Sequence, residues 1–104
     1  MDKIFEKFYQ WYKEKESDWN TKGIIIEKEH LEEKRGHHYS IHLKCENGLG
    51  NIVLYESNGE YWIYLEAGNY DYDVMFIRDN IKFLEFRDID GVVADMIEHM
   101  AEAL

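Results

Sequence analysis

The fold is decided by residues 38–66, which read HYSIHLKCENGLGNIVLYESNGEYWIYLE. The first part alternates apolar and polar residues, a period of two that is typical of a strand with one buried and one solvated face. The expected buried face carries Tyr39, Ile41, Leu43 and Cys45, and the expected solvated face carries His38, Ser40, His42 and Lys44. Asn47-Gly48 and Asn58-Gly59 are hairpin signals, because both residue types tolerate the positive φ of a tight turn. The stretch therefore predicts three antiparallel strands, the second at 51–56 and the third at 61–66.

Further strands are expected on both sides of this stretch. The β-branched run Ile24-Ile25-Ile26 predicts an earlier strand, which a charged turn at 32–36 separates from the next one. Downstream, Ala67-Gly68-Asn69 predicts a looser connection before a strand at 72–78. Asp79-Asn80 predicts one more turn, followed by a strand at 81–86. Together these segments form a meander of five or six strands.

A helix is predicted at each end of the meander. Residues 2–18 repeat apolar side chains at helical spacing, and so does the end of the chain, at Val93, Met96, Ile97, Met100, Ala101 and Leu104. Asp88 and Asp90 stand where carboxylates cap a helix. The predicted fold is α+β: an N-terminal helix, an antiparallel β-meander and a C-terminal helix, with both helices on one face of the sheet. Because no linker or repeat divides the chain, we expect residues 1–104 to form a single domain.

The negative charge is concentrated in the second half of the chain. Residues 1–52 contain ten acidic and nine basic residues, a net −1, whereas residues 53–104 contain twelve and three, a net −9. Nucleic-acid binding needs a basic surface, so we expect no direct nucleic-acid contact, and no binding to anionic membranes. A concentrated negative field instead attracts a basic protein partner, although the same acids could simply keep a small protein in solution.

The compartment follows from the same composition. No apolar run approaches the roughly 18 residues that span a bilayer, and the N-terminus lacks the apolar stretch of a signal peptide. A lone Cys45 cannot form a disulfide within the chain. We therefore expect a cytoplasmic protein with no membrane association.

The sequence contains few residues in patterns that suggest catalysis or metal binding. His30, His37, His38 and His42 cluster near one strand, but His38 and His42 would lie roughly 13 Å apart along it. No Cys pair or His-Glu-x-x-His supports a metal site, so neither a metal nor a cofactor is expected. The alternative function is a small hydrolase-like enzyme that uses His38, Ser40 and His42, or the Asp71/Asp73 pair.

A second pattern combines acidic and aromatic residues. Asp and Tyr alternate from residue 70 to residue 73, which would put the tyrosines on one strand face and the acids on the other if the strand begins this early. Trp62 and Tyr64 could join them on the solvated face, or could belong to the core while Tyr61, Ile63 and Leu65 face outward. Tyrosine and tryptophan supply contact area in protein interfaces, and acids attract Lys and Arg.

The chain resembles the immunity proteins of bacterial polymorphic toxins. The resemblance rests on its general plan and on the second half, through Gly50-Asn51-Ile52, Glu60-Tyr61-Trp62-Ile63-Tyr64, Glu66-Ala67-Gly68 and Asp71-Tyr72-Asp73-Val74 to the helix after Asp90. That part is similar to the TriTu-type group and to contact-dependent growth inhibition immunity proteins. The resemblance implies a protein that binds a cognate toxin domain, often a basic nuclease, and blocks its active site.

The residues expected to bind such a toxin are the acids and aromatics of the second half. They are Glu60, Trp62, Tyr64, Glu66, Tyr70, Asp71, Tyr72, Asp73 and Asp79. A monomer is the favoured oligomeric state, although the Ile24-Ile25-Ile26 segment could instead serve as an edge strand for self-association.

Overall fold

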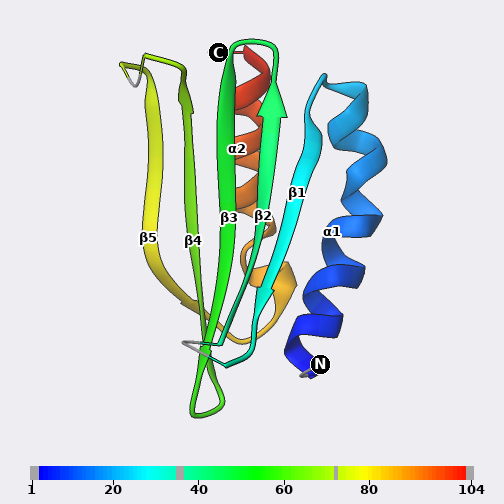
Figure 1. Ribbon diagram of the computed structural model, residues 1–104, viewed down its shortest axis with the longest axis vertical. Helices are drawn as coiled ribbons and strands as arrows, with labels where there is room; N and C mark the ends of the chain where they lie inside the picture. Colours follow the sequence, from blue (N-terminus) through cyan, green and yellow to red (C-terminus); the bar gives the residue numbers. More distant parts are fainter. Residues whose placement is uncertain (1–2, 35–36, 72, 103–104) are drawn as a thin grey trace.

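The fold is a five-stranded antiparallel sheet with a helix at each end of the chain (Figure 1). The computed structural model describes residues 3–34, 37–71 and 73–102. The elements follow in the order α1 (Lys3–Thr21), β1 (Ile25–Glu32), β2 (His38–Cys45), β3 (Gly48–Ser57), β4 (Glu60–Asn69), β5 (Met75–Phe83), a short 3₁₀ helix (Phe86–Asp88) and α2 (Asp90–Glu102). Strand order in the sheet equals chain order, so the predicted meander and the α+β class are confirmed.

Helix α1 ends three residues later than expected, at Thr21, and is followed by a glycine motif. Gly23 has a φ of 83°, and its N–H donates to the carbonyl of Asn20, while the N–H of Ile24 donates to the carbonyl of Trp19. This pair of bonds satisfies the last carbonyls of the helix. Ile24 and Trp19 are both buried, so the chain enters β1 from a fixed direction.

The two hairpin signals differ in outcome. Asn58 and Gly59 have φ values of 52° and 80°, as a primed two-residue turn requires, so that prediction is confirmed. The β2–β3 hairpin also exists, but its turn is Glu46-Asn47, because Gly48 already pairs with Cys45. Neither Asn47 nor Gly48 has a positive φ, so the expected turn chemistry was wrong there.

Two predicted connections are parts of strands. Ala67-Gly68-Asn69 belongs to β4 and pairs with β3, so the looser connection begins at residue 70, three residues later than predicted. Asp79-Asn80 is not a turn, because β5 continues through it to Phe83. Asn80 takes a φ of 52° at a register shift opposite β4. This β-bulge replaces the predicted turn and gives five strands rather than six.

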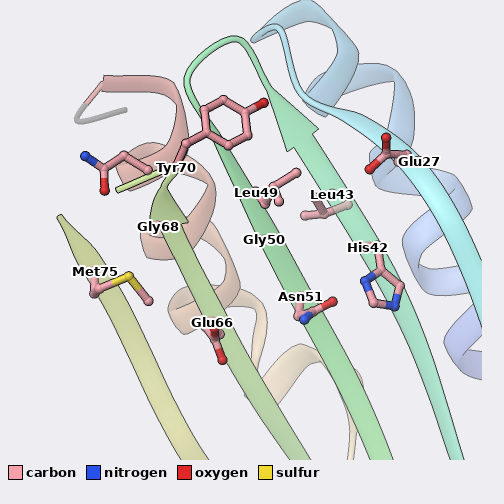
Figure 2. Close-up of a pocket in the computed structure, with 11 residues that line it drawn as sticks. Glu27, His42, Leu43, Leu49, Gly50, Asn51, Glu66, Gly68, Tyr70 and Met75 are labelled. Atoms are coloured by element: carbon pink, nitrogen blue, oxygen red, sulfur yellow. The ribbon is translucent and has the colours of Figure 1, made fainter. Parts of the chain in front are cut away.

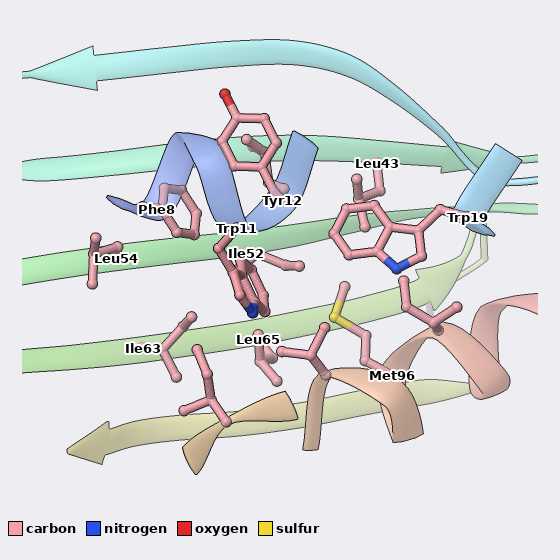
Figure 3. Packing of buried hydrophobic residues seen from close by; sticks show 14 of the residues in the cluster. Phe8, Trp11, Tyr12, Trp19, Leu43, Ile52, Leu54, Ile63, Leu65 and Met96 are labelled. Carbon is pink, nitrogen blue, oxygen red and sulfur yellow. The ribbon is translucent and has the colours of Figure 1, made fainter. Parts of the chain in front are cut away.

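One face of the sheet forms the core with both helices (Figure 3). On the α1 side, the ring of Phe8 lies 5.1 Å from that of Tyr39 on β2. On the α2 side, Met96 and Met100 pack directly over Gly50 on β3. Since Gly50 pairs with Leu43, which shares a face with Tyr39, both helices contact this face.

Partly buried polar contacts join α1 to α2. The indole of Trp11 donates to Asp90 at 2.9 Å, and the Lys15 ammonium lies 3.1 Å from the same carboxylate. Burial alone would raise the pKa of Asp90, but these two partners lower it below its usual value. Asp88, the other expected cap, instead accepts from the Glu85 N–H at 3.0 Å across the 3₁₀ helix. Asp90, the first residue of α2, therefore links the two helices.

The close approach of α2 to β3 gives a stability prediction. A Cβ added at Gly50 would lie 2.8 Å from the Met96 methyl and 2.9 Å from the Met100 sulfur, so Gly50→Val should lower the free energy of unfolding by about 1–3 kcal/mol. Gly91, within α2, has no atom within 4 Å of such a Cβ. Gly91→Ala should therefore leave stability unchanged or raise it by up to about 1 kcal/mol. Urea denaturation of both variants checks the pair, and equal losses would contradict the packing described.

Neither described helix combines the length and the apolar character needed to cross a membrane.

Candidate functional site

The second face of the sheet, which we call the open face, is the one that neither helix contacts. Cross-strand register arranges its side chains in rows that run from β1 to β5. Ile63 and Leu65 are fully buried beneath it, so Trp62 and Tyr64 point outward. This settles which row of β4 faces the core.

One row of the open face has aromatic side chains at its centre and a charged residue at each end. In strand order it contains Glu32, His38, Tyr55, Trp62 and Lys82. The ring centroids of His38 and Tyr55 are 5.8 Å apart, and the Lys82 ammonium lies 6.0 Å above the Trp62 ring. Lys82 also bonds Glu60 at 2.9 Å. These planar side chains form a surface of the kind that protein interfaces favour.

The next row of the open face contains Tyr64. Its hydroxyl donates a short hydrogen bond to Glu66, two residues along the same strand, and Asp79 lies opposite at the bulge. The hydrogen bond to Glu66, partial burial and the nearby carboxylates raise the pKa of Tyr64 to about 12. The phenol thus stays protonated at neutral pH and holds the Glu66 carboxylate in place.

A hollow of about 170 Å³ opens at one end of the open face (Figure 2). Glu27, His42, Asn51 and Glu66 contribute its polar lining from four neighbouring strands. Leu49, Tyr70 and Met75 contribute apolar lining. The Oδ1 atom of Asn51 is buried and has no hydrogen-bond partner among the described residues. We call this site the open-face hollow; Ile77, 48% exposed, lies in the row beside it.

Gly68 makes room for Met75 in the lining of the hollow. A Cβ at Gly68 would collide with the Met75 sulfur, so Met75 lies across the glycine. Gly68 pairs with Leu49 on β3 and with Met75 on β5, in the row next to that of Asn51 and Glu66. A larger residue at this position would displace Met75 and alter the floor of the hollow.

The described residues of the predicted Tyr and Asp alternation, 70, 71 and 73, do not lie in a strand. They are turn or bend, as is residue 74, and β5 begins at Met75. In this connection the side-chain carbonyl of Asn69 accepts from the Asp73 N–H at 3.0 Å and from the Val74 N–H at 3.3 Å, and its amide bonds the Asp73 carboxylate. The strand therefore begins later than the predicted face assignment requires, because Asn69 favours a local turn over a strand.

The predicted binding residues fall into two groups. Glu60, Trp62, Tyr64, Glu66 and Asp79 share the open face of β4 and β5. Tyr70, Asp71 and Asp73 are exposed in the β4–β5 connection, near the hollow and at the far end of β4 from Glu60. Tyr72 lies outside the described residues. Asn51, Leu49, Met75 and Ile77 were not predicted as site residues, because only the pairing of β3, β4 and β5 brings them together.

The histidines do not converge. His30 and His38 have ring centroids 5.7 Å apart, His42 lies in the hollow, and His37 bonds Glu56 at 3.1 Å. Throughout residues 3–34, 37–71 and 73–102, no three His, Cys, Asp or Glu side chains are close enough together to hold a metal ion. Ser40 is buried on the same strand, and Cys45 is also buried. The expected separation of His38 and His42 along β2 agrees with their register.

The raised pKa of Tyr64 gives a pH prediction. A tyrosine whose pKa rises on folding stabilises the folded state below its unfolded pKa of about 10, and this contribution is lost as the pH rises through about 12. Tyrosinate absorbance titrations of the native protein and of Glu66→Gln check it. We expect Glu66→Gln to bring one tyrosine back toward its usual pKa, and Tyr64→Phe to remove that transition. An identical titration curve for Glu66→Gln would show that the hydrogen bond does not form.

Comparisons with known proteins found no match: no family model, no curated protein and no solved structure matches the chain.

Proposed function

We propose that the protein is an immunity protein of the polymorphic-toxin type, which binds and neutralises a basic, nuclease-type toxin domain in the cytoplasm. The observation that carries this proposal is the open face, which neither helix contacts and which combines aromatic side chains with carboxylates. This face and the β4–β5 connection would bind the toxin. Their carboxylates would then occlude the cleft in which the toxin binds its polyanionic substrate. No catalytic step by this chain is required.

The charge distribution supports a basic partner. On β4 and β5 the open face carries Glu60, Glu66 and Asp79 against Lys82, and the connection adds Asp71 and Asp73. Lys28 and Lys44 lie at the β1–β2 side of the same face, so the negative field is strongest over β4 and β5. A field of this kind accelerates association with a positive surface. Trp62, Tyr64 and Tyr70 would then slow dissociation.

A second candidate function is a small enzyme, and the hollow is the observation that favours it. His42 and Glu66 line one concave site together, as a general acid and base could. No Ser, Cys, Thr or Lys is among the described residues that line it, so the nucleophile would be water, a substrate group or one of the lining carboxylates. The His38–Ser40 pair is less suited to the task, because Ser40 is buried.

A pull-down from the native host distinguishes these functions. The tagged protein is used at low and at moderate salt, and bound proteins are identified by mass spectrometry. We expect recovery of one protein with a basic domain, at a yield that falls with salt. Co-expression of the two should relieve growth inhibition caused by the captured domain alone.

Two variants test whether the open face binds the partner. Trp62→Ala removes the large aromatic side chain from this face and should lower the recovery of the partner. Tyr9→Ala, on the exposed side of α1, is the control and should leave the recovery unchanged. If no basic protein is recovered at either salt, the immunity proposal is wrong, and a screen of small substrates against His42→Ala becomes the next experiment.

A further inference from the structure

We infer that the open-face hollow receives one arginine side chain of the partner. This inference rests on the proposed function, because it names the group that the partner would present. It goes further by assigning the hollow, rather than the acidic face in general, to a single guanidinium group.

The polar lining of the hollow offers acceptors to a cation. Glu66 on β4 and Asn51 on β3 are directly opposite each other in the register, so their side chains start about 5 Å apart. Tyr64 already bonds one oxygen of Glu66, which fixes the carboxylate and leaves its second oxygen for an incoming donor. The unpartnered Oδ1 of Asn51 adds a buried acceptor, whose unsatisfied state costs free energy until a donor arrives.

The charges around the hollow favour a positive ligand. Glu27 stands on the β1 side and Glu66 on the β4 side, with His42 and Asn51 between them (Figure 2). No Lys or Arg is among the described lining residues. The Lys44 ammonium comes within 3.9 Å of Glu27, whereas Glu66 has no cation partner in the described part of the chain. Glu66 is therefore the carboxylate available to an external cation.

The apolar lining selects arginine over lysine. Tyr70 is 51% exposed and Leu49 42% exposed, and both line the hollow beside Met75. An aromatic face and aliphatic side chains suit the flat, weakly hydrated guanidinium group and its three-carbon stem. Its five donors can reach acceptors on two strands at once, which the compact ammonium of lysine does less well.

The test uses N-acetyl-arginine amide as the probe, with N-acetyl-citrulline amide, its neutral isostere, and N-acetyl-lysine amide as controls. Each is titrated into the ¹⁵N-labelled full chain and followed by two-dimensional NMR. We expect saturable shifts with the arginine probe at the side-chain amide of Asn51 and at the backbone amides of Glu66 and Tyr70. The citrulline probe should leave these signals in place, and the lysine probe should bind several-fold more weakly.

Glu66→Gln and Glu14→Gln form the matched pair of variants. Each removes one carboxylate, the first from the hollow and the second from the exposed side of α1. Glu66→Gln should weaken the binding of the arginine probe at least fivefold, and Glu14→Gln should leave it unchanged. Equal effects of the two variants, or equal binding of arginine and citrulline probes, would overturn the inference.

The two proposals fail separately. If the pull-down recovers a basic toxin domain whose binding depends on Trp62 but the arginine probe does not bind in the hollow, only the inference is wrong. If the probe binds in the hollow and no protein is recovered, the hollow is a guanidinium site and the immunity proposal is wrong. With the partner in hand, Glu66→Gln should show coupling to one arginine of the partner in a double-mutant cycle.

Discussion

Replacing Phe8 by Ala should lower the free energy of unfolding by about 3–5 kcal/mol. The Phe8 side chain is fully buried, and its ring contacts Tyr39 on β2, Trp11 and Tyr12 on α1, and Phe86 beyond β5. Its removal therefore loses the buried apolar surface of the Phe8 ring and four contacts between aromatic rings, at the point where α1 packs on the sheet. Guanidinium or urea denaturation followed by tryptophan fluorescence measures the loss, which is a large share of the stability of a domain this size.

Tyr9→Ala is the matched control, because Tyr9 is the next residue of α1 but is 41% exposed. It should cost less than about 1 kcal/mol. Similar losses for the two variants would mean that α1 does not dock on β2 through Phe8 in solution.

Reversing both acids of the β4–β5 connection, with Asp71→Lys and Asp73→Lys, should slow association with the proposed basic partner by at least tenfold at low salt. The double variant changes the formal net charge from −10 to −6, since each reversal adds two charges. Because both carboxylates are exposed beside the hollow, they contribute to the long-range field more than to packing. Stopped-flow or surface plasmon resonance measurements at several salt concentrations test the prediction, and the difference should shrink as salt rises.

The control has the same net charge but places it elsewhere. Glu6→Lys with Glu14→Lys also gives −6, and both residues are exposed on α1, away from the open face. Its association rate should stay close to that of the native protein. If the two double variants slow association equally, then net charge, and not the position of the acids, governs the encounter.

Local sequence patterns predicted the parts of the fold that depend on near neighbours. The alternation in β2 placed Tyr39, Ile41 and Leu43 in the core correctly, and Asn58-Gly59 identified a turn whose φ values match. The error at Asp79-Asn80 has a physical reason. A residue that tolerates positive φ suits a turn and a β-bulge equally, and only pairing with β4 shows that the strand continues.

The candidate site was less predictable because it depends on pairing between strands. Trp62 and Tyr64 had two possible orientations until the burial of Ile63 and Leu65 fixed them. Asn51 lies fifteen positions before Glu66, and only the β3–β4 register puts them opposite each other. Gly68, which was predicted to lie in a connection, belongs to β4 and makes room there for Met75 in the lining of the hollow.

The bulge at Asn80 also affects how the protein behaves at high concentration. A regular outer strand offers its free backbone groups to other molecules and can start edge-to-edge aggregation. On β5 the bulge interrupts that repeat, and Arg78, Asp79 and Lys82 are exposed around it. This side of the sheet is thus a poor template for a sixth strand from another copy. A cell could accordingly accumulate the protein in excess over its partner without polymerisation through β5.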